Sequence, residues 1–133
     1  MPLVIDASVA APWALADEPY GQASRRAFEV AQSGEACAPS LWWVELRNVL
    51  LVAERRRRIE AEVVDGFFTE IDALPIDLDR TPDGASLIRL ARTHGLSAYD
   101  ALYLELALRR GAELATLDRR LAAAAEAEGV RLV

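Results

Sequence analysis

Acidic side chains stand where apolar segments of this sequence end, and such positions are suited to chemistry. Asp6 directly follows the apolar β-branched run 3–5, and Asp118 stands at the C-terminal end of a second expected strand, 113–116. Both segments are expected to be buried strands of a parallel sheet, and the carboxyl ends of such strands share one edge. A site at that edge would contain both carboxylates.

Two further carboxylates stand on the apolar sides of expected helices. Asp100 falls beside Tyr103 on its helix, and Glu45 projects among aliphatic residues with Asn48 next to it. A carboxylate in apolar surroundings needs a partner. Helix N-termini and strand C-termini share one edge of a doubly wound sheet. We therefore expect one pocket to contain Asp6, Glu45, Asp100 and Asp118.

Each of these acids also has a purely structural explanation. Asp6, Asp100 and Asp118 each stand where a side chain could cap the N-terminus of a helix. Glu45 could instead make a buried structural hydrogen bond. Any one of these explanations is reasonable alone, but all four together are much less so.

Carboxylates gathered in one pocket would hold a divalent cation, because they otherwise repel one another. Oxygen ligands select Mg²⁺ or Mn²⁺ over zinc or copper. Such a site suits hydrolysis of phosphodiesters: one ion activates and aligns a water, and a second ion about 4 Å away stabilises the leaving oxygen. No histidine base is needed, and the one histidine, His94, is expected at a helix end.

Composition restricts the remaining function classes. The 133 residues fit one domain, residues 1–133. All fifteen basic residues are arginine, so sites that need a lysine are excluded, and the one cysteine, Cys37, excludes an internal disulfide and a thiolate metal cage. The net charge of −6 and the pI near 4.8 disfavour non-specific binding to nucleic acid, so an RNA-binding role needs a local basic patch, a cation or a basic partner. No signal peptide or membrane-spanning run is present, so we expect a cytoplasmic protein with no membrane partner.

Strands and helices are expected to alternate along the chain. Strands are expected at 3–5, 36–38, 75–78, 113–116 and 130–133, and helices at 9–15, 21–33, 41–58, 59–74, 83–94, 98–110 and 119–128. This order predicts an α/β fold, a three-layer α/β/α sandwich with a central, mostly parallel sheet. Helix 41–58 is apolar nearly all round and is expected to be largely buried. On helix 98–110, Glu105 and Arg109 are expected to form an i,i+4 pair facing water.

Four segments, in this order, resemble the PIN domain and, more narrowly, the VapC-type ribonuclease toxins of type II toxin–antitoxin systems. They are Val4-Ile5-Asp6-Ala7-Ser8, Glu45-x-x-Asn48, Ser97-Ala-Tyr-Asp-Ala-Leu-Tyr103 and Thr116-Leu-Asp118. The resemblance covers the chain from Leu3 to Val133. It implies that the PIN-like fold carries an acidic catalytic and metal-binding set supported by polar side chains that orient acids or water. The acids would be Asp6, Glu45, Asp100 and Asp118, and the supporting residues Ser8, Asn48 and Thr116.

The resemblance also implies an activity and partners. These are Mg²⁺-dependent endonucleolytic cleavage of RNA, with Mn²⁺ able to substitute, a homodimer, and inhibition by a cognate VapB-type antitoxin whose tail occupies the active-site groove. Trp13, Trp42 and Trp43 are candidates for the apolar contact with that tail. Packing in the core or in a dimer interface is the alternative for each of them.

Other functions compete with this one. A PIN-like module could bind RNA or protein without catalysis, although the intact acid set argues against it. A DNA-directed nuclease would share the metal chemistry, and only substrate tests separate the two. An aspartyl phosphotransferase ranks last, because position 8 is Ser8 and the chain has no lysine.

Overall fold

A four-stranded parallel sheet forms the middle of the protein in the computed structural model, which describes residues 1–133. The strands stand in the order β3-β2-β1-β4. They are β1 (Leu3–Ile5), β2 (Ala36–Pro39), β3 (Asp77–Asp79) and β4 (Glu113–Ala115). Val4 of β1 pairs with Cys37 on one side and Leu114 on the other, so the first strand of the chain is central.

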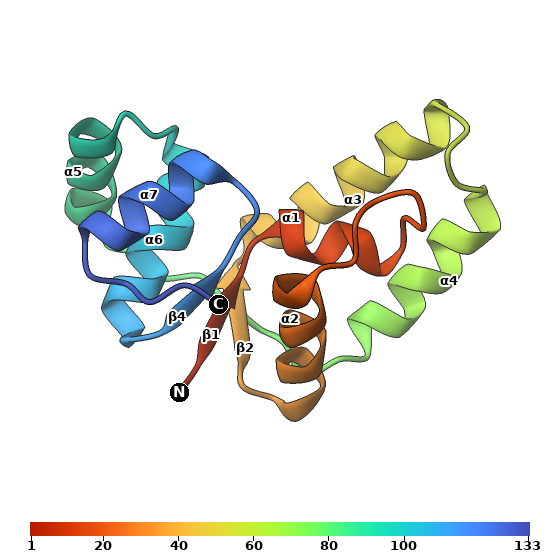
Figure 1. The fold of residues 1–133 in the computed structure, drawn as a ribbon, viewed down its shortest axis with the longest axis horizontal. Coiled ribbons are helices and arrows are strands. Elements are labelled where there is room, and N and C mark those ends of the chain that lie inside the picture. Colours follow the sequence, from red (N-terminus) through yellow and green to blue (C-terminus); the bar gives the residue numbers. More distant parts are fainter.

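Helices cover both faces of this sheet, as predicted for a three-layer α/β fold. They are α1 (Ala7–Ala10), the 3₁₀ turn η1 (Ala11–Trp13), α2 (Gln22–Ser33), α3 (Leu41–Arg55), α4 (Ala61–Asp72), α5 (Gly84–His94), α6 (Ala98–Arg110) and α7 (Arg119–Ala127). In Figure 1, α2 lies on one face of the sheet and α6 on the other, and α5 and α7 pack on α6. No helix is long and apolar enough to cross a bilayer.

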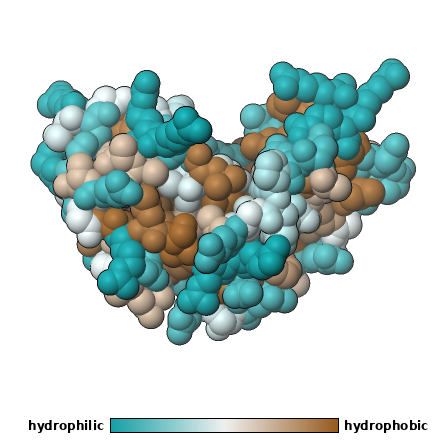
Figure 2. All heavy atoms as spheres, in the orientation of Figure 1, coloured by the Kyte–Doolittle hydropathy of each residue, from teal (hydrophilic) through white to brown (hydrophobic).

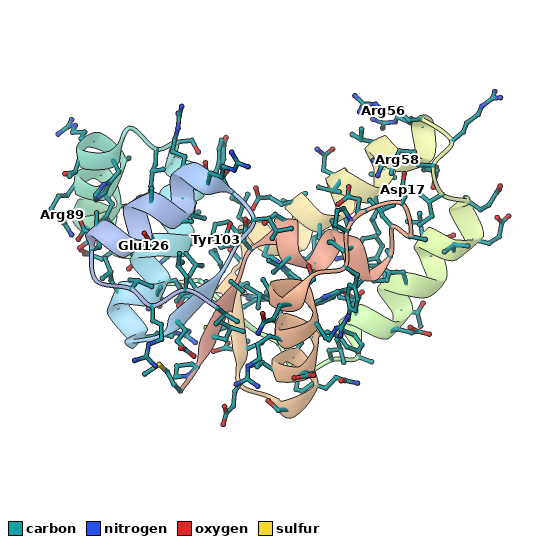
Figure 3. All side chains as sticks on the ribbon, viewed as in Figure 1. Asp17, Arg56, Arg58, Arg89, Tyr103 and Glu126 are labelled. Carbon is teal, nitrogen blue, oxygen red and sulfur yellow. The ribbon has the colours of Figure 1, made fainter.

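Helices α3 and α4 form an arm that extends away from the sheet (Figure 1). The arm has a small apolar core of its own, formed by Ala11, Leu15, Leu50, Ala53 and Val64. At the far end of the arm, Arg58 makes an ion pair of 2.8 Å with Asp17, and Figure 3 shows these two side chains together. This ion pair joins the end of α3 to the loop that follows η1.

Capping residues and glycines set the helix ends largely where the sequence places them. The Asp83 carboxylate accepts a hydrogen bond from the Ser86 N–H at the start of α5. Gly111 ends α6 with φ of +59°, a conformation in which glycine avoids the strain of a Cβ atom. The expected helix 9–15 is instead divided into α1 and η1, because Pro12 stands in the first turn of η1.

The expectation that helix 41–58 is largely buried is wrong. Helix α3 ends at Arg55, and Trp43, Val44 and Leu51 are 47%, 51% and 41% exposed. Hydropathy alone could not separate these residues from the buried ones, because α3 packs on its neighbours along only part of its surface. The expected last strand, 130–133, is also absent, and a single bridge joins Leu132 to Leu114.

The expectation that Glu105 faces water is wrong as well. Glu105 is 2% exposed, because α5 and β3 cover that side of α6. Its carboxylate accepts hydrogen bonds from the Asp83 N–H and from Arg109. Arg109 also binds the buried carboxylate of Asp79, so a charged network takes the place of a surface pair.

Candidate active site

A hollow in the molecular surface lies beyond the carboxyl ends of β1 and β4. Figure 2 shows this hollow between the body formed by α5, α6 and α7 and the arm formed by α3 and α4, and β1 and β4 run toward it (Figure 1). Asp6 directly follows β1, and its N–H donates to the Ala115 carbonyl at 3.0 Å, which continues the pairing of β1 with β4. The side chain is only 8% exposed.

Two hydroxyl groups hold the Asp6 carboxylate. Ser8 Oγ donates to Asp6 Oδ2 at 2.8 Å, and Thr116 Oγ1 donates to the same oxygen at 2.7 Å. The two hydroxyls also accept hydrogen bonds: Ser8 Oγ from the Leu117 N–H and Thr116 Oγ1 from the Asp118 N–H. Two of the three supporting residues named from the sequence, Ser8 and Thr116, therefore contact Asp6 and fix the loop after β4 against it.

Burial raises the pKa of Asp6, and the hydroxyls of Thr116 and Ser8 only partly offset this effect. The negative charge of Asp118 raises it further. Asp6 is therefore a carboxylate that would gain from a nearby positive charge.

Asp118 caps a helix, as its structural explanation required. Its Oδ1 accepts hydrogen bonds from the N–H groups of Arg120 and Leu121, at 2.9 and 3.0 Å, at the start of α7. Its second oxygen, Oδ2, accepts no hydrogen bond. Capping fixes the direction of this carboxylate and leaves one oxygen free for another role.

Asp100 does not provide the cap of its own helix. The Ser97 hydroxyl does so by accepting the Asp100 N–H at 3.1 Å, and Asp100 lies in the first turn of α6. Burial raises the pKa of Asp100, and the negative charges of Asp118 and Asp6 raise it further. These effects place Asp100 within electrostatic reach of both other acids.

Glu45 reaches the same region from α3. Burial raises the pKa of Glu45, and the negative charges of Asp6 and Asp100 raise it further. The hydrogen bond from Tyr103 lowers this pKa and so partly offsets the effect of burial. The Tyr103 hydroxyl donates to Glu45 Oε1. Figure 3 labels Tyr103 on α6, on the side of the helix that faces the middle of the molecule.

Tyr103 lies near the site, and its sequence position predicts only that it belongs to the apolar side of its helix. It is 0% exposed. Its spacing of three residues from Asp100 was the available signal, since residues three apart share a helix face. Asn48 differs from the other supporting residues: it is exposed and its side chain makes no hydrogen bond.

The four acids approach one another without forming a compact cage. No group of three or more histidine, cysteine, aspartate or glutamate side chains is arranged closely enough to hold a metal ion. The donor set nevertheless fits a hard divalent cation, because it consists of carboxylates, of which three have raised pKa values from burial and mutual repulsion. A cation would remove the cost of charging them together.

Comparison with known proteins identifies the family of this chain. The PIN domain family matches residues 3–127 of the chain. The chain belongs to the PIN domain family. A curated PIN relative, Ribonuclease VapC3 of Pyrobaculum aerophilum, is 32% identical over 126 residues, which cover 92% of this chain and 93% of the relative.

Solved structures show the same fold. The crystal structure of PAE2754 from Pyrobaculum aerophilum matches all of this PIN domain and 90% of that chain, with a TM-score of 0.76 at 22% identity. The crystal structure of FitAcB from Neisseria gonorrhoeae matches 98% of this chain and 95% of that chain, with a TM-score of 0.66 at 16% identity. The predicted PIN-like three-layer fold is therefore confirmed.

Proposed function

We propose that residues 1–133 form a single PIN nuclease domain that hydrolyses RNA phosphodiester bonds with Mg²⁺, for which Mn²⁺ can substitute. The observation that carries the proposal is the electrostatic interaction of Asp6, Glu45 and Asp100: burial raises the pKa of each, and the negative charge of Asp6 further raises the pKa values of Glu45 and Asp100. A relative that shares 32% of its residues over 92% of this chain is named a ribonuclease, which supports RNA as the substrate.

The proposed roles of the residues follow from their contacts. Asp6 and Asp100 are the main cation ligands, and Glu45 and Asp118 complete the acidic set. The hydroxyls of Ser8 and Thr116 fix the direction of the Asp6 carboxylate. A bound divalent cation would lower the pKa of the attacking water and neutralise negative charge on the phosphate. The chain itself offers no histidine at this site, since the His94 ring is hydrogen-bonded to Glu128 at the end of α5.

An acidic chain needs local positive charge to bind RNA, and exposed arginines on both sides of the hollow can provide it. Arg55, Arg56 and Arg57 are exposed at the end of α3 and have no acidic partner, whereas Arg58 is neutralised by Asp17 and Glu18. Figure 3 shows Arg56 at the tip of the arm. Phosphate contacts by such arginines would oppose the repulsion between RNA and the net charge of −6.

The opposite side of the hollow carries Arg119 and Arg120, which are exposed and form no ion pair. Burial and the charges of Asp118 and Asp6 raise the pKa of Asp100, and the positive charge of Arg120 partly offsets this. The field of Arg120 therefore reaches the acidic site, where a scissile phosphate would lie.

We further propose that the protein acts in the cytoplasm as the toxin of a type II toxin–antitoxin pair, as a homodimer inhibited by a VapB-type antitoxin. The VapC3 relative supports this role. Of the tryptophans named from the sequence, Trp42 is 2% exposed and Trp13 is half-buried with its indole N–H bound to the Ser24 carbonyl. Trp43, with Val44 and Leu51 on the exposed side of α3, is the remaining candidate for the antitoxin contact.

The test is cleavage of a pooled RNA substrate by purified protein, free of antitoxin, with Mg²⁺, with Mn²⁺ and with chelator. Asp6→Asn is compared with Asp65→Asn, which changes an exposed aspartate on α4 in the same way. We expect cleavage that requires metal and Asp6 and is unaffected at position 65. Cleavage of single-stranded DNA in preference to RNA would redirect the proposal to a DNA-directed nuclease. RNA binding without cleavage by folded protein, in every metal condition, would favour the non-catalytic binding module.

A further inference from the structure

The four acids of the site come from two separate parts of the fold. Asp6, Asp100 and Asp118 stand at the ends of the sheet and on the helices of the body, whereas Glu45 is the only one on the arm. Helix α3 packs mainly on α1, η1, β2 and α4. Something must therefore hold the Glu45 carboxylate toward the acids of the body.

The Tyr103 hydroxyl makes this connection. Its hydrogen bond to Glu45 Oε1 is the only side-chain hydrogen bond between α3 and α6, and the only hydrogen bond made by the Glu45 side chain. Tyr103 is 0% exposed within the main apolar core, so its ring is held on all sides. A rigid donor thus orients a long, flexible side chain that is only half-buried.

The bond occupies one oxygen of Glu45 and leaves the other free. Oε1 accepts the Tyr103 hydroxyl, and Oε2 accepts no hydrogen bond. Two other acids of the site likewise receive two donors on one oxygen. Both hydroxyls that hold Asp6 reach its Oδ2, and both N–H groups that hold Asp118 reach its Oδ1. Donors on one oxygen of a carboxylate are the usual means of directing the other oxygen at a cation.

We propose that Tyr103 is a positioning residue, whose hydroxyl holds Glu45 so that the carboxylate oxygen Oε2 is presented to the divalent cation shared with the acids of the body. This inference rests on the metal-binding part of the proposed function and not on the identity of the nucleic acid. Tyr103 does not touch the substrate; it acts through Glu45 alone.

The test is Mn²⁺ binding to the full chain, measured by isothermal titration calorimetry without RNA. Tyr103→Phe keeps the buried ring and removes only the hydroxyl, and we expect its Mn²⁺ affinity to fall about 10-fold or more. Tyr99→Phe is the matched control, because Tyr99 is 63% exposed on the same helix and makes no hydrogen bond. We expect its affinity to equal that of the wild type, and thermal unfolding checks that both variants are folded.

Two further variants separate positioning from a general structural effect. Glu45→Asp keeps the charge but shortens the side chain, and we expect it to weaken Mn²⁺ binding with Tyr103 intact. In the Glu45→Ala background, adding Tyr103→Phe should cause no further loss, because the hydroxyl then has no carboxylate to position. Three results would each overturn the inference. They are an equal loss of Mn²⁺ affinity from Tyr103→Phe in both backgrounds, an unchanged Mn²⁺ affinity in Tyr103→Phe, and the absence of Mn²⁺ binding by the wild type. RNA cleavage is measured separately, so a failure of the ribonuclease proposal remains distinguishable from a failure of this one.

Discussion

Replacing Arg109 by methionine is expected to destabilise the fold far more than its partly exposed side chain implies. Arg109 Nε donates to Glu105 Oε1 at 2.6 Å, and Arg109 Nη2 donates to Asp79 Oδ2 at 2.6 Å. Both carboxylates are buried, at 2% exposed for Glu105 and 6% for Asp79. Methionine preserves much of the aliphatic packing but leaves two buried negative charges without this partner.

The magnitude follows from what remains after the change. Glu105 would keep only the Asp83 N–H at 3.0 Å, and Asp79 would keep Arg110 at 3.1 Å. Removing one partner of a buried pair costs about 3–5 kcal/mol, and the low end applies because Arg110 still neutralises Asp79. A loss of about 3 kcal/mol corresponds to a fall in Tm of roughly 10 °C for a domain of this size.

The measurement is urea unfolding followed by far-UV circular dichroism at pH 7 with chelator. The control is Arg89→Met, which removes a weaker ion pair of 3.3 Å between a 54% exposed arginine and Glu128. The control should cost at most about 1 kcal/mol, as surface pairs do. Equal losses of unfolding free energy in Arg109→Met and Arg89→Met would refute the assignment of a buried charged network around Arg109.

The pH dependence gives a second check. Burial acts to raise the pKa of Asp79, but the hydrogen bonds and charges of Arg109 and Arg110 outweigh it, so the pKa lies below the ordinary value of 3.8. The unfolded chain then binds more protons between the folded pKa and 3.8, and stability from Asp79 is lost as the pH falls through that interval. The difference in the free energy of unfolding between wild type and Arg109→Met should therefore become smaller below pH 4. A difference that stays constant with pH would count against the explanation.

Three other variants test the site and the arm. Asp100→Asn should abolish cleavage, yet at pH 7 without metal it should raise the resistance of the fold to urea. Burial raises the folded pKa of Asp100 above the unfolded value of 3.8, so the wild type loses stability as the pH rises from 3.8 through the folded pKa, and the advantage of the variant should vanish at lower pH. A destabilised variant would instead make Asp100 a structural residue. Mn²⁺ should raise the Tm of the wild type and not that of Asp6→Asn, as differential scanning fluorimetry would show; equal shifts would place binding elsewhere. Arg47→Leu should cost about 1 kcal/mol in urea unfolding, because it removes the 2.8 Å ion pair to Asp72 that joins α3 to α4; an unchanged midpoint would show that the pair adds nothing.

The sequence predicted the parts of the fold that depend on local signals. A β-branched run followed by an acid located β1 and Asp6, and the helices expected at 98–110 and 83–94 begin in the structure beside the capping side chains of Ser97 and Asp83. Each of the four predicted acids interacts electrostatically with at least one other in the structure, as the shared sheet edge predicts. These features depend on residues within a few positions of one another and on the general geometry of parallel sheets.

The other features of the fold and the site depend on which helices and strands pack against one another, and the sequence alone does not reveal this packing. Glu105 and Arg109 have the spacing of a surface pair, and only the packing of α5 and β3 on that side turns them into a buried network. Trp43 and Trp42 are adjacent and equally hydrophobic, yet one is exposed and the other buried because α3 is covered on one side. Tyr103 could be placed near Asp100, but its bond to Glu45 joins residues 58 positions apart.

The pairing of β1 with β4 also sets the moment at which a newly made chain acquires its acidic site. Asp6 is bound by the Thr116 hydroxyl, 110 residues later, and β1 lacks its neighbour on that side until β4 has been synthesised. At about 5–20 residues per second, roughly 5–20 s of translation separate the two halves of this contact. An incomplete chain on the ribosome therefore carries Asp6 without the partners that orient it. A polypeptide that ends anywhere before Thr116 lacks one of the two hydroxyls that hold the Asp6 carboxylate.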